Sequence, residues 1–336
     1  MERNAATRIV IPQTALRVSR LCLGGVPLGT ALGPDQSFAL LDAFIAAGGN
    51  FIDTAHVYGD WVTGAERSAS EKTIGRWLKA RGFPADIVVA TKIGHPKLSA
   101  LNKPRLDRDA LRSDTQAALN NLGVAKLDLV YLHRDDPSRP VGDIVAALEE
   151  LRSDGVIGHY AASNWSAERL EKAQRLARTE HWQGFIANQP GWSLARRNPG
   201  TGDPGTVEMD AEAFAFHART QLAAIPYSTQ AKGYFTKLLA GRLGGEVKAA
   251  YDNSPNRVLG RRVGAVADGY HTTPEAAVLA SLMAAPFPVI PIVGCMTPAQ
   301  VAASFASLDL KLPHDVLQAF AGYLFADVGT PVPVPA

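Results

Sequence analysis

The stretch "GGNFIDTAHVYGD", residues 48–60, begins as a buried strand would and ends in a polar loop. Its apolar pair, Phe51 and Ile52, is followed at once by Asp53 and shortly afterwards by Tyr58. Short apolar runs bounded by glycine are typical of strands that are buried on both faces of a parallel sheet. In such proteins the chemistry lies at the carboxyl ends of the strands. The stretch therefore predicts a parallel sheet with a functional site at one edge.

Similar runs recur along the chain and alternate with amphipathic segments of helical period, which predicts parallel strands joined by helices. The eight predicted strands cover residues 21–25, 50–55, 86–93, 127–133, 157–164, 185–189, 222–228 and 288–294. Between them, residues spaced by three or four share a helical face, as do Leu111, Thr115, Ala118 and Leu122, and also Val141, Ile144, Leu148 and Leu151.

Start and stop signals support these helices. Thr63 with Glu66 predicts a capping box. Another helix is predicted to start with an N-cap, an N1 proline and an N3 glutamine at Thr297, Pro298 and Gln300. Gly123 and Gly155 stand where helices are expected to end.

Eight parallel strands in series close into a (β/α)8 barrel, whereas an open sheet usually carries a glycine-rich nucleotide loop after a strand. No such loop occurs, because "GGVPLG" at 24–29 has its glycines at the wrong spacing. We predict an α/β TIM barrel in a single domain over 1–336, with a core at about 8–312 and a C-terminal helix and tail at 313–336. Long βα loops at 94–106, 193–209 and 229–268 are expected to set specificity.

Composition narrows the class of protein. The 336 residues carry a formal net charge of +2 without long runs of one sign, so we expect neither a nucleic-acid nor a membrane partner. The N-terminus lacks a long apolar region after its charges, and Cys22 and Cys295 lie far apart without metal-ligand spacing. We expect a cytoplasmic protein without a metal site; the oligomeric state is not predicted.

Four titratable residues end three neighbouring predicted strands. Asp53 and Tyr58 follow the second strand, Lys92 ends the third and His133 ends the fourth. Each alone would more often be an ordinary surface or satisfied polar residue, but their joint placement on one rim indicates a site. No histidine pair typical of metal hydrolases and no GxSxG nucleophile motif is found.

The motifs around these residues resemble the aldo-keto reductases, in order and in their placement on strands. They are "GGNFIDTAHVYG", "VVATKIG", "VYLHRDD", "AASNW", "NQPGWSLARR" and "IPYSTQAKG", and the match runs from about residue 8 to about 312. The resemblance implies an NAD(P)(H)-dependent barrel oxidoreductase that acts on an aldehyde, a ketone or the corresponding alcohol. Its catalytic tetrad would fall on Asp53, Tyr58, Lys92 and His133.

Elementary chemistry agrees with these roles. Hydride delivery to a carbonyl carbon leaves negative charge on the oxygen, which needs a proton donor or preorganised hydrogen bonds. Tyr58 is the expected general acid/base, and a Lys92 ammonium about 4 Å away would favour its phenolate by up to ~4 kcal/mol at an effective dielectric constant near 20. Asp53 would pair with Lys92, and His133 would donate to the carbonyl oxygen.

The resemblance also implies a cofactor site on the same rim. Ser163, Asn164 and Gln189 would bind the nicotinamide carboxamide, Trp192 would stack on the ring or simply pack at the barrel mouth, and Ser228 with backbone N–H groups would cradle the pyrophosphate. The remaining expected cofactor contacts are Gly24, Tyr227, Thr229, Gln230, Lys232, Gly294, Cys295, Met296, Thr297 and Gln300.

One departure from the family concerns the choice of dinucleotide. Members that prefer NADP commonly carry Arg or Lys where this chain has Met296, and a Glu-Asn pair where it has Ala303 and Ser304. Loss of a charge-assisted partner for the 2′-phosphate typically forfeits about 1.5 to 3 kcal/mol. We expect weak discrimination, with NAD(H) used at least comparably to NADP(H).

The substrate pocket is less defined by sequence. His56, Trp61 and Trp165 are expected to line it and would suit a small hydroxylated aldehyde or a sugar-like ketone. Residues 134–136 either add hydrogen-bonding groups or form a solvated turn before Pro137. A second hypothesis is a redox-sensing subunit that binds the cofactor but catalyses weakly or not at all.

Overall fold

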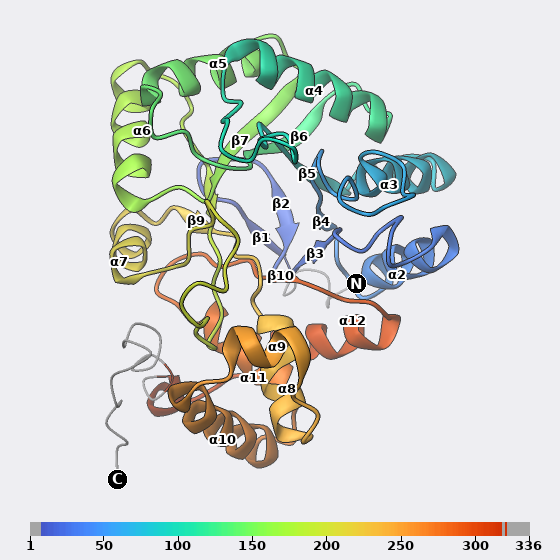
Figure 1. Cartoon of the computed structure of the whole chain (residues 1–336), viewed down its shortest axis with the longest axis vertical. Helices are drawn as coiled ribbons and strands as arrows, with labels where there is room; N and C mark the ends of the chain where they lie inside the picture. Colours follow the sequence, from blue (N-terminus) through green and yellow to red (C-terminus); the bar gives the residue numbers. More distant parts are fainter. Residues whose placement is uncertain (1–7, 318–319, 321–336) are drawn as a thin grey trace.

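The computed structural model describes residues 8–317 and residue 320, and a parallel sheet of eight strands forms its centre (Figure 1). From β3 to β9 consecutive strands pair with one another, and the last strand, β10, pairs with the first, β3. They are β3 (Cys22–Gly24), β4 (Phe51–Asp53), β5 (Val88–Ile93), β6 (Leu127–Leu132), β7 (Ile157–Ser163), β8 (Ala187–Gln189), β9 (Ala223–Ala224) and β10 (Ile292–Val293). Each lies inside a predicted strand, so the prediction is confirmed, although the observed strands are shorter.

Hydrogen bonds from the segment before β10 close the sheet. Ala224 N–H donates to the carbonyl of Pro288 at 2.9 Å, and Ile290 N–H donates to the carbonyl of Ala224 at 2.9 Å. Ile292 N–H continues the contact to the carbonyl of Pro226 at 2.9 Å. Because these bonds join the two ends of the strand order, the sheet curls into the predicted (β/α)8 barrel.

An antiparallel hairpin that the sequence did not predict precedes the barrel. It consists of β1 (Arg8–Val10) and β2 (Arg17–Ser19). Its Ile11 and Val18 are fully buried against residues near the amino ends of the strands, including Phe51 and Val88. The hairpin therefore covers the amino end of the barrel interior, and it lies across the middle of the view in Figure 1. The opposite end remains for chemistry.

Helices surround the barrel as the periodicity predicted (Figure 1). Those between or after strands are α2 (Pro34–Ala46), α3 (Ala69–Ala80), α4 (Arg108–Leu122), α5 (Val141–Ser153), α6 (Ala167–Thr179), α7 (Ala211–Thr220), α11 (Pro274–Met283) and α12 (Pro298–Phe305), followed by the 3-10 turn η2 (Ala306–Leu308). In α4 the predicted face is buried, and the expected end signal Gly123 is the C-cap with φ of 70°. In α5, Ile144, Leu148 and Leu151 are buried. Gly155 follows the C-cap Asp154.

One predicted helix start is wrong. The Thr63–Glu66 pair lies in turns, and α3 begins only at Ala69 after the N-cap Ser68. Glu66 instead forms an ion pair with Arg76, 2.6 Å between Oε1 and Nη2. At α12, Thr297 is the N-cap as predicted, and its hydroxyl accepts from Gln300 N–H.

The three segments that were expected to be specificity loops differ in how much regular secondary structure they contain. Segments 94–106 and 193–209 remain loops, whereas 229–268 is largely helical. It contains the 3-10 turn η1 (Ala231–Gly233), α8 (Tyr234–Leu239), α9 (Gly245–Tyr251) and most of α10 (Ser254–Gly269). The predicted C-terminal helix and tail at 313–336 lie mostly outside the described residues, of which 314–317 are helical. No helix within the described residues is both long and apolar enough to cross a membrane.

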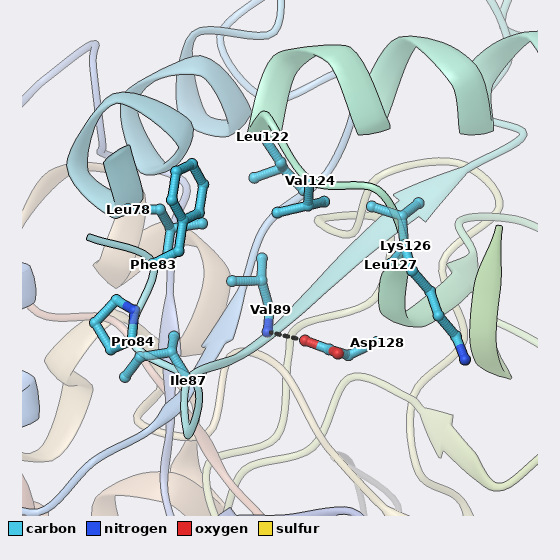
Figure 2. Close-up of a pocket in the computed structure, with 10 residues that line it drawn as sticks. All are labelled: Leu78, Phe83, Pro84, Ile87, Val89, Leu122, Val124, Lys126, Leu127 and Asp128. Atoms are coloured by element: carbon cyan, nitrogen blue, oxygen red, sulfur yellow. Dashed lines mark hydrogen bonds between the residues drawn. The ribbon is translucent and has the colours of Figure 1, made fainter. Parts of the chain in front are cut away.

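Figure 2 shows a pocket of about 100 Å³ near the amino ends of β5 and β6. Leu78 of α3 and Leu122 of α4 line it together with Phe83. At its edge the Asp128 carboxylate accepts a hydrogen bond from Val89 N–H at 3.3 Å. The predicted site residues stand at the opposite ends of these strands, so this pocket belongs to the packing of helices on the sheet.

Helix α3 approaches α4 closely at Gly75. A Cβ at this position would lie 2.2 Å from the carbonyl oxygen of Asn121 and 2.9 Å from Cα of Leu122, both backbone atoms that have no room to yield. We predict that Gly75→Ala lowers the free energy of unfolding by about 2 to 3 kcal/mol, the usual cost of overpacking.

Gly142→Ala in α5 is the matched control, because its Cβ would meet only the flexible Cδ2 of Leu176 at 3.2 Å. Thermal unfolding of both variants should show a clear loss for Gly75→Ala and little change for Gly142→Ala. Equal midpoints would contradict the close approach of the two backbones.

Candidate active site

A buried lysine forms the centre of the site. The Lys92 side chain is 1% exposed, and its Nζ donates to Asp53 Oδ2 at 2.6 Å, to the carbonyl of Thr54 at 2.9 Å and to the hydroxyl of Tyr58 at 3.0 Å. An ammonium group has three N–H donors, and all three are used here. Lys92 therefore joins the predicted acid and the predicted proton donor directly.

The register of neighbouring strands produces this contact. Asp53 ends β4 opposite Ala90 of β5, and Lys92 lies two residues further along β5 on the same face. Beyond the strand, Thr54 N–H donates to the carbonyl of Ala90 and His56 N–H to that of Lys92. The loop thus continues alongside β5, which brings Tyr58 over the lysine.

Aromatic contacts hold the Tyr58 ring. Trp61 and His133 both meet it edge-on, with ring centroids at 5.9 and 5.8 Å, and Lys92 Nζ lies 4.7 Å from its centroid. His133 follows β6 directly and is buried, with 7% exposure. The structure therefore brings Asp53, Tyr58, Lys92 and His133 together at the carboxyl ends of β4, β5 and β6.

The electrostatics of Tyr58 differ from the expectation. Burial raises the pKa of its hydroxyl above the ordinary value, and although the Lys92 charge opposes this, Asp53 adds to it. For Lys92, burial opposes protonation, but the charges and hydrogen bonds of Asp53 and Tyr58 together outweigh it and raise the pKa of the ammonium. The site thus holds a protonated tyrosine beside a charged lysine, because burial of the phenol, with a further contribution from Asp53, outweighs the field of Lys92 that was expected to ionise it.

His133 is neutral in this environment. Burial, followed by the charge of Lys92, lowers the pKa of its ring well below the ordinary value. The ring of His95 packs edge-on against it at 4.7 Å between centroids. A neutral imidazole keeps one N–H, which suffices to donate to a carbonyl oxygen.

The three residues expected at the carboxamide lie in one hydrogen-bond network with the tetrad. Gln189 Nε2 donates to Asp53 Oδ1 at 2.9 Å, and Ser163 Oγ donates to the carbonyl of Gln189 at 2.8 Å. Asn164 Nδ2 donates to the carbonyl of His133 at 3.0 Å. The network links the ends of β4, β6, β7 and β8, so these side chains have fixed positions beside Lys92.

The structure places Tyr227, rather than Trp192, against this network. The Tyr227 hydroxyl donates to Asn164 Oδ1 at 2.8 Å. Trp192 is only 4% exposed and packs with Phe214 and Phe287, each about 6.0 Å away between ring centroids. Packing thus accounts for Trp192, whereas Tyr227 contacts the network beside the tetrad.

Backbone conformation sets apart the segment expected to hold the pyrophosphate. Ser228, Ala231, Lys232 and Gly233 all have positive φ, between 47° and 75°. Runs that mix right- and left-handed residues turn several N–H groups toward one side, which creates an anion-binding concavity. The Lys232 side chain forms an ion pair with Glu246 of α9. Gln230 precedes η1 as its N-cap.

The segment after β10 adjoins this one. Thr229 Oγ1 donates to the carbonyl of Ile292 at 2.7 Å, and a Cβ on Gly24 of β3 would touch Ile292 at 3.1 Å. Beyond Gly294, Cys295 is buried, whereas the side chain of Met296 is 43% exposed. The N–H of Met296 donates to Gln300 Oε1 at 2.6 Å. The two segments with expected cofactor contacts therefore meet at β10.

The three expected substrate contacts separate in the structure. Trp61 is 51% exposed beside Tyr58 and can line the mouth. His56 lies at the mouth with its Nδ1 toward Glu71, 3.3 Å away; burial opposes protonation, but Glu71 raises the pKa of the ring. Trp165 is 1% exposed and packs edge-on against Phe185, so the expectation that it contacts substrate is wrong.

Residues 134–136 were expected either to add hydrogen-bonding groups to the site or to form a turn, and the structure gives different answers for the two acids and for the arginine. The Asp135 carboxylate pairs with Arg169 at 2.8 Å, and Asp136 accepts from Ser138 Oγ at 2.6 Å, as expected of a structural turn. Arg134 is half-buried, and its Nη1 donates to the carbonyl of the preceding His133 at 3.2 Å. The turn explains the two acids but not the arginine.

Sequence reasoning missed two polar residues near the tetrad. Glu71 is fully buried and accepts hydrogen bonds from Thr91 Oγ1 at 2.5 Å and Asn121 Nδ2 at 2.8 Å, in addition to its contact with His56. His95 packs on His133. His95 gave one signal, its position just after a strand, whereas Glu71 lies within α3 and gave none.

Comparison with known proteins agrees with this geometry. A norsolorinic acid reductase of Emericella nidulans is 27% identical over 97% of this chain and 83% of its own length. An NADP(+)-named aryl-alcohol dehydrogenase of Phanerodontia chrysosporium is 27% identical over 93% of this chain and 84% of its own length. The model of the Aldo/keto reductase family matches residues 20–323, and the chain therefore belongs to this family of oxidoreductases.

Proposed function

We propose that this chain is an NAD(P)(H)-dependent carbonyl reductase in which Tyr58 donates the proton. The observation that carries the proposal is the contact of one ammonium group, Lys92 Nζ, with both Asp53 and the Tyr58 hydroxyl. The bound nicotinamide would supply the hydride. Ser163, Asn164 and Gln189 would hold its carboxamide, and the concave backbone at 228–233 would take its phosphates.

The remaining steps belong to side chains of the chain itself. The substrate oxygen would accept hydrogen bonds from both the Tyr58 hydroxyl and the His133 ring. The rings of these two residues lie edge-on, with centroids 5.8 Å apart. As negative charge develops on that oxygen, the neutral His133 donates a hydrogen bond and Tyr58 transfers its proton. Lys92 then stabilises the tyrosinate that remains.

At neutral pH the protonation state of this site favours reduction of a carbonyl over oxidation of an alcohol. Burial raises the pKa of Tyr58, so the hydroxyl carries the proton that reduction consumes. Alcohol oxidation requires the tyrosinate as base, and its population grows as pH rises toward that pKa. The proposal therefore includes oxidation that is favoured by more alkaline conditions than reduction.

The substrate is proposed to be an aromatic or similarly flat carbonyl compound. Trp61 offers ring surface next to Tyr58, and Tyr227 offers a second ring beside Asn164 of the same network. Relatives named for norsolorinic acid reduction and aryl-alcohol dehydrogenation support the same class. The earlier sugar-like alternative has fewer supporting contacts, since Asp135 and Asp136 bind protein groups. A cytoplasmic location is part of the proposal.

Tyr58→Phe removes the proton donor and keeps the ring volume. We predict that kcat with 4-nitrobenzaldehyde falls by roughly 10² to 10⁴, because general acid catalysis is lost. Cofactor affinity, followed by quenching of tryptophan fluorescence, should change by less than about twofold. Turnover near that of the native protein would refute Tyr58 as the acid, and a native protein that binds the cofactor tightly without any turnover would favour a redox-sensing subunit.

Lys92→Met should abolish most turnover and also destabilise the fold. The substitution leaves the Asp53 carboxylate buried without its cation, a change that typically costs about 3 to 5 kcal/mol. The double variant Asp53→Asn with Lys92→Met should regain stability in thermal unfolding but remain inactive. Recovery of turnover together with stability would show that Lys92 serves folding alone.

Met296→Arg tests the dinucleotide preference. Met296 is exposed at the start of α12, so an arginine there has room to reach a 2′-phosphate. We predict that the variant binds NADPH about ten- to hundredfold more tightly than the native protein, the value of a charge-assisted contact, with little change for NADH. Met296→Leu is the neutral control. The prediction fails if native protein already prefers NADPH by a hundredfold or if arginine brings no gain.

A further inference from the structure

Arg134 is a half-buried cation beside the site that forms no ion pair with any described residue, although the charge of Asp203 on the 193–209 loop acts on it and opposes the lowering of its pKa by burial. Within the part of the chain that the structure describes, no acidic oxygen lies within 4 Å of its guanidinium, and its one hydrogen bond goes to the carbonyl of His133. The acids that follow it are directed elsewhere, Asp135 to Arg169 and Asp136 to Ser138. The guanidinium therefore retains most of its hydrogen-bonding capacity.

Its surroundings place this cation near the reacting groups. Its charge opposes the rise that burial causes in the pKa of Tyr58 and of Tyr227, so it lies within electrostatic range of both hydroxyls. On the other side, a Cβ on Gly205 would lie 3.6 Å from Arg134 Cδ, so the 193–209 loop packs along the side-chain stem. Arg134 is thus enclosed between the end of β6 and that loop, within electrostatic range of Tyr58.

Other arginines near the mouth show the usual arrangement. Arg197 on the same loop is paired with Glu208 at 3.2 Å, and Arg169 forms two hydrogen bonds with Asp135. A partly buried charge without a counter-ion is costly, and a protein normally supplies one. An arginine kept in this state beside a reaction site provides a binding position for an anion from solution.

We propose that Arg134 binds an anionic oxygen, a carboxylate or an ionised phenol, on an aromatic carbonyl substrate. The planar guanidinium can donate two parallel hydrogen bonds to such a group, which a lysine cannot reproduce. This inference rests on the proposed function and specifies its substrate class. It makes Arg134 a determinant of specificity and orientation, while proton transfer remains with Tyr58.

The test compares charged and neutral substrates of the same shape. For each protein, kcat/KM is measured with 4-formylbenzoate, with 4-hydroxy-3-nitrobenzaldehyde, which is ionised at neutral pH, and with neutral methyl 4-formylbenzoate. In Arg134→Gln the ratio of charged to neutral kcat/KM should fall ten- to hundredfold, mainly through KM. Arg134→Lys should give an intermediate ratio. The matched control Arg197→Gln, which removes a compensated cation, should keep the ratio within about twofold.

Three results would overturn the inference. The ratio could be unchanged in Arg134→Gln, or Arg197→Gln could lower it equally, which would assign the effect to the general charge of the mouth. Alternatively, Arg134→Gln could weaken binding of the dinucleotide while the ratio is kept, which would assign Arg134 to the cofactor.

A second measurement separates this inference from the proposed function. Calorimetric titration of sodium benzoate into the protein with oxidised cofactor requires no turnover. Binding to the native protein that is at least tenfold weaker in Arg134→Gln supports the anion site even if no aldehyde is reduced. Equal binding by both proteins contradicts it even if reduction occurs.

Discussion

The buried ion pair between Lys92 and Asp53 is the interaction on which the rest of the site depends. A fully buried ammonium is tolerated only when its charge is balanced and its three N–H groups are satisfied. Here a carboxylate of β4, a carbonyl beyond that strand and the Tyr58 hydroxyl meet these requirements. They coincide only if β4 and β5 are adjacent, parallel and in the observed register, so the barrel is a condition for the chemistry and not only its support.

Hydrogen bonds of backbone and amide groups connect this ion pair to the other polar side chains of the rim and fix their positions. Asp53 fixes Gln189, whose carbonyl accepts from Ser163. Asn164, the next residue, binds the carbonyl of His133 and the hydroxyl of Tyr227. Each polar side chain is thus positioned by a strand other than its own, which keeps the rim rigid with few side-chain degrees of freedom. Such preorganisation lowers the reorganisation required when charge develops on a substrate oxygen.

The sequence predicted the strands well because most of them lie in short apolar runs that the barrel buries. The tetrad was predictable because all parallel strands of a barrel end at the same rim. Titratable residues at the ends of neighbouring strands therefore come together there. The hairpin was missed because strands as short as β1 and β2 carry little pattern. Thr63 with Glu66 matches the local pattern of a capping box, but the loop continues past them and the helix starts only at Ala69.

The roles of Trp192 and Trp165 could not be predicted, because hydrophobic periodicity does not show whether an aromatic ring in a loop points into the core or toward the site. The lowered pKa expected for Tyr58 was wrong, because sequence gave the charges near the hydroxyl but not the cost of burial.

Charge balance at the mouth connects the reaction to the substrate class. Lys92 and Asp53 cancel, and burial together with nearby cations keeps His133 neutral, as shown by its lowered pKa. Among the described residues that surround the tetrad, Arg134 then remains as a cation that forms no ion pair. A site with this balance favours states that bring negative charge, whether carried by the substrate or developing on its oxygen. The same arginine would therefore attract an anionic carbonyl compound before reaction and orient it, while Tyr58 and His133 act on the oxygen at which charge develops.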